Sequence, residues 1–194
     1  MMTRRLRRTA LAVLLSISSS GVAHSEPIAA EAATCERAME KAARSLHVPL
    51  AILYAVGLAE TGRKGTMSPF ALNVAGKPIF PHDKGGAVAA FEAARKKGTK
   101  LIDVGCMQIN HRYHGEAFGS VSDMLDPERN VRYAAEFLAR LRQREGNWTM
   151  AVARYHAGPN NDPAQKRYVC RVIENMIAVG AGRWTTESQR FCKG

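Results

Sequence analysis

Glu60 is the residue of this chain whose surroundings best suit it to acid–base chemistry. It stands near the end of an apolar segment, residues 49–61, which is followed by Gly62, and a glycine commonly follows the end of a helix. Apolar residues recur there at the spacing of one helix face: Ile52, Leu53, Val56 and Ala59. In the last turn, burial and the negative end of the helix dipole both disfavour an ionised carboxylate. An acid that keeps its proton can give it to a leaving oxygen, as cleavage of a glycosidic bond requires.

A second segment, residues 103–110, combines one acid with two amides in the order Asp-Val-Gly-Cys-Met-Gln-Ile-Asn. Gln108 and Asn110 can donate and accept hydrogen bonds, which suits them either to the hydroxyl and amide groups of a ligand or to local capping. Asp103 is the nearest second acid, and we expect it to cap or orient the turn at Gly105. Gly105 itself permits a close backbone approach, to a ligand or to a neighbouring helix.

A third segment, residues 151–158, reads Ala-Val-Ala-Arg-Tyr-His-Ala-Gly and is predicted to be helical. Tyr155 offers a hydroxyl on an apolar helix, although a tyrosine in that setting can simply fill the core. His156 offers an imidazole, the side chain that changes charge near neutral pH.

Taken in order, residues 57–62 (Gly-Leu-Ala-Glu-Thr-Gly), 103–110 and 151–158 resemble the lytic transglycosylase domain of the soluble, lysozyme-like type, the SLT family. The corresponding family motifs read E-S-G, G-L-M-Q-I-N and A-Y-N-A-G. The resemblance covers about residues 35–180; each motif alone is weak, and the ordered triple is fairly specific. It implies a mainly α fold, a lysozyme-like α-helical domain.

The resemblance also implies the activity, that of a peptidoglycan lytic transglycosylase without cofactor or metal. In the family one Glu protonates the oxygen of the MurNAc–GlcNAc β-1,4 bond and then takes a proton from the 6-hydroxyl of the muramic sugar, so that a 1,6-anhydromuramoyl end forms and no water is consumed. Carried onto this chain, the catalytic residues are Glu60 and Tyr155, with the Tyr155 hydroxyl directed toward Glu60. The residues expected to bind substrate are Thr61, Gly105, Met107, Gln108, Asn110, His156, Ala157 and Gly158.

The chain departs from the family pattern at several positions. Thr61 replaces the usual Ser and keeps a hydroxyl, whereas His156 stands where the family has Asn and could replace that amide or make activity depend on pH. Residues 64–100 lengthen the spacing between the first two motifs. They contain a predicted small β-hairpin within 70–82, and we expect this insert to form one wall of the cleft.

Four cysteines form an even set, which suits two disulfides in an exported chain, and spacing alone allows three pairings. Cys106 replaces an apolar residue of the second motif, and a disulfide there would brace the loop beside Glu60. We expect Cys35 to pair with Cys106 and Cys170 with Cys192. No C-x-x-C pair indicates zinc.

The N-terminus has the three-part order of a signal peptide: four arginines, an apolar run over residues 10–17, then small residues. We predict cleavage after Ser25, a short leader at 26–34 and one domain over 35–194, in the periplasm and without a membrane-spanning segment. Removing residues 1–25 takes away four of 28 basic residues and no acid, so 24 against 17 leaves a net charge of +7. In an exported protein such a charge favours the cell wall over nucleic acid.

The predicted helices are 35–46, 49–61, 85–97, 127–145, 148–155 and 163–179. Residues 101–110 are predicted to be a short buried segment, and 180–194 a tail.

Two alternatives stay open for the function. One is a hydrolytic muramidase with Asp103 or Asp83 as helper, and the other is a non-catalytic glycan-binding accessory of a cell-envelope machine. The expected partner is the peptidoglycan glycan strand, bound by a monomer. A secretion or conjugation apparatus is a further partner that the resemblance suggests, and we expect no nucleic-acid binding.

Overall fold

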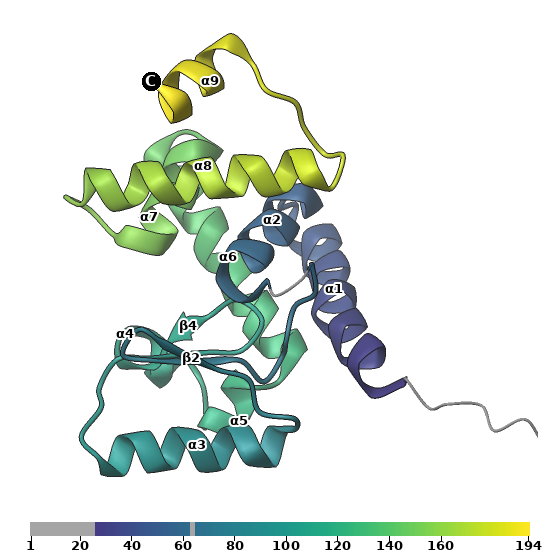
Figure 1. Ribbon diagram of the computed structural model, residues 1–194, viewed down its shortest axis with the longest axis vertical. Coiled ribbons are helices and arrows are strands. Elements are labelled where there is room, and N and C mark those ends of the chain that lie inside the picture. Colours follow the sequence, from purple (N-terminus) through teal and green to yellow (C-terminus); the bar gives the residue numbers. More distant parts are fainter. Residues whose placement is uncertain (1–25, 63–64) are drawn as a thin grey trace, which may run out of the picture.

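The computed structural model describes residues 26–62 and 65–194, which form a layer of helices with one small sheet beside it (Figure 1). The signal peptide predicted for residues 1–25 lies outside the described residues. The longer helices are α1 (Glu26–Leu46), α2 (Leu50–Thr61), α3 (Lys84–Lys96), α6 (Pro127–Glu145), α7 (Trp148–Ala157), α8 (Asp162–Ala178) and α9 (Thr186–Lys193). The short ones are α4 (His111–His114), the 3-10 turn η1 (Gly115–Ala117) and α5 (Val121–Met124).

Local signals in the sequence set several of the helix bounds. The Asp126 side chain accepts from the Arg129 N–H at the start of α6, and Pro127 takes the first position, where no N–H is needed. Gly146 ends α6 in the left-handed conformation that glycine adopts without strain. Asn147 then caps α7 through the Met150 N–H. The predicted range 127–145 is therefore confirmed to the residue.

The core lies where the apolar faces of the helices meet. α1 packs on α6, α6 on α7, and α2 on α8, as Figure 1 shows for the upper part of the molecule. Side chains of each of these helices are buried there: Met39, Leu53, Val56, Val131, Leu138, Ala151 and Tyr168. Asn175 of α8 also donates to the Ala55 carbonyl of α2, 3.0 Å away, which fixes the two helices in register.

The sheet is antiparallel, with strand order β2-β1-β3-β4. Its strands are β1 (Leu72–Val74), β2 (Lys77–Ile79), β3 (Ile102–Val104) and β4 (Ile109–Asn110). β1 and β2 form the predicted hairpin, turning through Ala75 and Gly76 with positive φ. The insert is thus part of a larger sheet that incorporates the second motif, and α3 and α5 cover its lower side in Figure 1.

Three sequence predictions need correction. α1 begins at Glu26, so the leader predicted for 26–34 is helical and continuous with the first helix. Residues 101–110 form β3 and β4, which are too short to show periodicity and exist through pairing with a distant hairpin. The tail contains α9, which buries no residue and starts at a capping box between Thr185 and Ser188.

Both expected disulfides are present. Cys35–Cys106 joins α1 to the loop between β3 and β4, and Cys170–Cys192 holds α9 on α8. Disulfides persist in oxidising compartments, which fits a location outside the cytoplasm. Over the described ranges, no helix is long and apolar enough to cross a bilayer.

Candidate active site

Glu60 lies one residue before the end of α2, and its side chain is 14% exposed. The next residue, Thr61, is buried, and its hydroxyl lies 3.2 Å from both the Gly57 carbonyl and the Cys106 carbonyl. The end of α2 is therefore tied to the second motif, and the Cys35–Cys106 disulfide secures the same loop from α1. These contacts fix the position of Glu60 relative to the sheet.

The hydroxyl that hydrogen-bonds Glu60 is that of Tyr168 on α8. It donates to Oε1 at 2.6 Å, and Tyr168 is 2% exposed. Burial first, and then the negative charge of Glu60, raise the pKa of Tyr168 well above its ordinary value, so it remains a donor at neutral pH. The Tyr168 bond thus engages Oε1 and leaves Oε2 as the other carboxyl oxygen.

His156 stands beside the same carboxyl oxygen. Its Nδ1 is 3.7 Å from Glu60 Oε1, and its ring lies parallel to that of Tyr168 with centroids 4.1 Å apart. The imidazole is 41% exposed, so one face rests on Tyr168 while its edge reaches the cleft. A residue in this place can contact both the acid and a ligand.

Tyr155 does not donate to Glu60 as the sequence analysis expected. Its hydroxyl donates to the Met107 carbonyl at 2.8 Å, because α7 lies over the loop of the second motif. Burial raises the pKa of Tyr155 well above its ordinary value, and the charges of Glu60 and Asp103 raise it further. The ring still lines the cleft beside Glu60, packed against Phe137 at 5.7 Å between centroids.

The loop between β3 and β4 is held by Asn130, a fully buried residue of α6. Its side chain accepts from the Met107 N–H at 2.9 Å and donates to the carbonyls of Val104 and Met124. A Cβ at Gly105 would stand 2.6 Å from the Asn130 amide nitrogen, and Gly105 has a φ of +80°. Gly105 is thus needed for close approach to a neighbouring helix, the second of the two roles that the sequence allowed.

Several polar side chains of the sheet and of the β3–β4 loop bond to groups within the sheet and its loops. Asn110 donates to Asp103 at 2.6 Å across the β3–β4 pair, and Gln108 donates to the carbonyls of Ala71 and Gly105. Burial raises the pKa of Asp103, and the charge of Glu60 adds to that rise, while the Asn110 hydrogen bond and His156 lower it. Asp103 pairs with Asn110 and leaves the Gly105 turn to Asn130.

These residues surround a cleft with a volume of about 600 Å³ between the helices and the sheet. Its lining includes Glu60, Asn73, Asp103, Gln108, Ile109, Asn110, Tyr113, His114, Phe137, Arg154, Tyr155, His156, Ala157, Gly158 and Pro159. Aromatic rings, amides and a few charged groups together suit a large, uncharged, hydroxyl-rich ligand.

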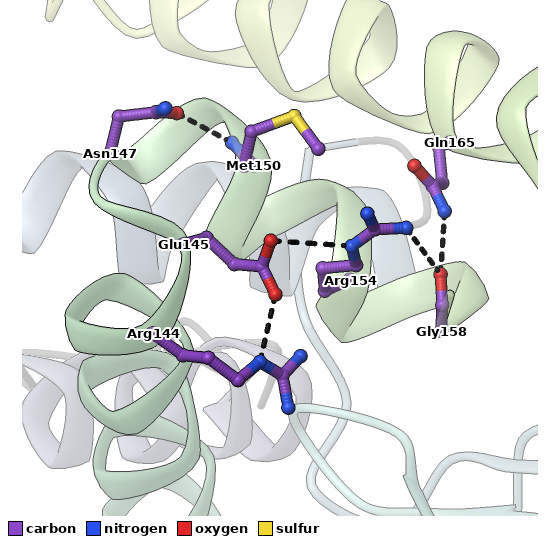
Figure 2. A network of polar contacts seen from close by, with 7 residues as sticks. All are labelled: Arg144, Glu145, Asn147, Met150, Arg154, Gly158 and Gln165. Carbon is purple, nitrogen blue, oxygen red and sulfur yellow. Dashed lines mark hydrogen bonds and ion pairs between the residues drawn. The ribbon is translucent and has the colours of Figure 1, made fainter. Parts of the chain in front are cut away.

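The cleft wall at residues 157–159 is held by the network that Figure 2 shows. The Gly158 carbonyl accepts from Gln165 Nε2 at 2.5 Å and from Arg154 Nη1 at 3.4 Å. Glu145 at the end of α6 lies 3.5 Å from Arg154 Nε and 2.8 Å from Arg144 Nε, as the dashed lines in Figure 2 trace. Gly158 has φ +60° and ψ −166°, a combination that only glycine adopts readily, so this backbone is fixed from three helices.

The predicted site residues fall into two groups. Glu60, Gln108, Asn110, Tyr155, His156, Ala157 and Gly158 line the cleft. Thr61, Gly105 and Met107 are buried beneath it, where the Thr61 hydroxyl and the backbone of Met107 are hydrogen-bonded to neighbouring protein groups. Asp83, a helper in the hydrolytic alternative, caps α3 through the Gly86 N–H and does not line the cleft.

Sequence reasoning missed Tyr168, Asn130 and Asn73. Tyr168 falls on the apolar face of the predicted helix 163–179, which agrees with its buried ring, but helical spacing does not indicate which group its hydroxyl bonds. Asn73 of β1 lies opposite Asp103 in the sheet, and among the described residues its buried Oδ1 has no hydrogen-bond partner. A donor group on a ligand in the cleft could satisfy this oxygen. No residue spacing marks any of the three, because Tyr168 and Asn130 bond to groups far away in the chain and Asn73 meets Asp103 only through the pairing of β1 with β3.

A helical domain with a small antiparallel sheet, and an acid at the end of a helix facing the cleft between them, define a lysozyme-like glycan-cleaving protein. Comparison with family models matches residues 37–175 to the transglycosylase SLT domain, and the chain belongs to that family. Searches among curated proteins and among solved structures found no match. Family membership gives a lytic transglycosylase type of glycan cleavage and peptidoglycan as the bound polymer.

Proposed function

We propose that this protein is a periplasmic peptidoglycan lytic transglycosylase. It cleaves the MurNAc–GlcNAc β-1,4 bond of the glycan strand and leaves a 1,6-anhydromuramoyl end. The observation that carries the proposal is the position of Glu60, which lies in the cleft with Oε1 fixed by the Tyr168 hydroxyl at 2.6 Å. A carboxyl held in one orientation can present its other oxygen to a bound sugar.

The reaction runs in two proton transfers through Glu60. The protonated carboxyl gives its proton to the bridging oxygen as the bond from the muramic anomeric carbon to that oxygen breaks, and the GlcNAc side leaves with a hydroxyl. The resulting carboxylate takes the proton of the muramic 6-hydroxyl while that oxygen bonds to the anomeric carbon. Glu60 is protonated again, and all atoms are balanced without water.

The other side chains around the cleft orient the Glu60 carboxyl and the substrate. The Tyr168 hydroxyl bond holds the carboxyl through both transfers. His156 is placed to contact the substrate beside Glu60, with Gln108 and Asn110 on the opposite side. Backbone groups of Ala157 and Gly158 complete the contacts, and Tyr155 keeps the second motif beneath the substrate through the Met107 carbonyl.

A hydrolytic muramidase is the second candidate, because Asp103 lines the same cleft. A hydrolase of this kind needs a second carboxylate to act on water or on the sugar. Against it, Asp103 accepts from Asn110 at 2.6 Å and its burial raises its pKa, so it is occupied and less inclined to ionise.

The test is digestion of purified peptidoglycan followed by mass spectrometry of the products. We expect anhydro ends from the wild type and at most about a hundredth of that yield from Glu60→Gln. Reducing ends in place of anhydro ends would favour the muramidase. If wild type and Glu60→Gln both clear cell walls no faster than a control without enzyme, the remaining candidate is a non-catalytic glycan-binding accessory.

A further inference from the structure

The short helix α4 carries three ring side chains, and two of them are anchored in the fold. The His111 ring meets Phe91 of α3 edge-on, with centroids 4.8 Å apart. His114 Nδ1 lies 2.9 Å from the Tyr133 hydroxyl, and its ring packs against Phe137 at 5.1 Å. Contacts on both sides of the helix therefore fix the direction in which the third ring points.

The third ring, Tyr113, is 69% exposed and lines the cleft that contains Glu60. Among the exposed large hydrophobic side chains of the described residues it has the highest exposed fraction. The Arg112 guanidinium carbon lies 5.7 Å from its ring centroid. Tyr113 thus contributes little to the core, and its apolar faces remain in contact with water at the rim of the site.

An exposed tyrosine ring beside a glycan cleft has a matching ligand surface. Pyranose rings present C–H groups on their faces and hydroxyls around their edges, so a sugar face can cover the aromatic ring while its edge bonds to polar groups. Asn110 lies three residues before Tyr113 on the same wall and supplies such polar atoms. A rigid aromatic side chain gives binding area at a small cost in conformational entropy.

We propose that Tyr113 is a stacking platform for a sugar ring of the glycan strand, at a position away from the bond that is cleaved. The proposal rests on the proposed function for the identity of the strand. It assigns Tyr113 to substrate affinity and leaves the proton transfers to Glu60.

Phe191 provides a matched control. It is 45% exposed on α9, and Lys166 Nζ lies 5.6 Å from its ring centroid, so it shares with Tyr113 an exposed ring near a cation. It does not line the cleft. If removing the ring weakens binding at Tyr113 and not at Phe191, the effect comes from a contact in the cleft and not from nonspecific binding to exposed aromatic rings.

The experiment measures binding of peptide-free glycan strands, prepared from sacculi with an amidase, to proteins that all carry Glu60→Gln. Tyr113→Ala is expected to weaken binding about tenfold, because it removes the face on which the sugar stacks. Tyr113→Phe and Tyr113→Trp should retain the affinity of the Glu60→Gln parent, and Phe191→Ala should leave that affinity unchanged. In the active enzyme, Tyr113→Ala should raise KM with kcat little changed on long strands.

Unchanged affinity for Tyr113→Ala would overturn the proposal, and so would a loss of equal size for Tyr113→Phe, because stacking needs the ring and not the hydroxyl. The melting temperature of each variant checks that the fold is intact. The outcome is separable from that of the proposed function. Anhydro products with Tyr113-independent binding refute the platform alone, whereas Tyr113-dependent binding without turnover supports the platform and refutes the activity.

Discussion

The two walls of the cleft use their polar groups in different ways. On the helical wall, side chains from α2, α7 and α8 converge on one carboxyl: Tyr168 donates to Glu60 and His156 stands 3.7 Å from it. On the sheet wall, the amides of Gln108 and Asn110 bond to neighbouring groups of the same wall. The polar groups of the helical wall thus position the Glu60 carboxyl, whereas those of the sheet wall mainly hold the conformation of that wall. Changes on the first should lower kcat, and changes on the second should lower stability or affinity.

The largest expected effect lies on the helical wall at Glu60. Glu60→Gln keeps the shape and can accept the Tyr168 hydrogen bond, but it cannot donate a proton as an acid does. We expect kcat on peptidoglycan to fall roughly 10²- to 10⁴-fold, the usual contribution of a positioned acid–base residue. Turbidity clearing of cell walls gives the rate, and circular dichroism checks the fold. More than a tenth of wild-type activity would break the comparison at its centre.

The largest effect on stability is expected at Asn130, which supports the sheet wall from α6. Asn130→Ala leaves the Met107 N–H and the carbonyls of Val104 and Met124 without their partner in a buried site. We expect a loss of about 3 kcal/mol or more in the free energy of unfolding. Urea denaturation measures it. Asn147→Ala, which removes an exposed helix cap, is the control and should cost about 1 kcal/mol. Equal losses would show that the loop does not depend on Asn130.

Tyr168 and Tyr155 sharpen the comparison within the helical wall. Tyr168→Phe keeps the ring stacked on His156 and removes the bond to Glu60, so kcat should fall about ten- to a hundredfold with KM little changed. Tyr155→Phe removes a bond to a backbone carbonyl and should cost about 1 kcal/mol of stability, with a smaller loss of kcat. Steady-state kinetics on both variants measure which tyrosine hydroxyl contributes more to kcat. The reverse order would restore the role first expected for Tyr155.

The smallest effect concerns Asp103. Burial raises its pKa, so the folded chain holds this proton more tightly than the unfolded chain does. Its contribution to stability is fully present below its unfolded pKa and is lost as pH rises through the higher folded value. Asp103→Asn, which can still accept from Asn110, removes this dependence. We expect the variant to gain stability relative to the wild type between pH 3 and pH 7, as thermal melting at both pH values measures. A difference independent of pH would contradict the prediction.

The sequence predicted best what is encoded locally. Asp126-Pro127 and Gly146 set the bounds of α6, because caps and a left-handed glycine act within one turn. Glu60 was predicted near the end of its helix, where it lies, because the apolar face and Gly62 that define this helix are adjacent to it in the chain. β3 and β4 were missed because strands of two or three residues carry no period and depend on partners in the hairpin. The hydroxyl of Tyr168 reaches Glu60 over 108 residues, a contact that spacing along one helix cannot reveal.

The measurement that tests the central claim most directly is digestion of peptidoglycan in water enriched in ¹⁸O, with mass spectrometry of the released ends. If the proton of the muramic 6-hydroxyl goes to Glu60 and that oxygen closes the ring, the products are anhydro ends without label. Wild type and Asp103→Asn should then give the same unlabelled products. One ¹⁸O atom in each new end, lost together with activity in Asp103→Asn, would contradict the account and assign water as the attacking group.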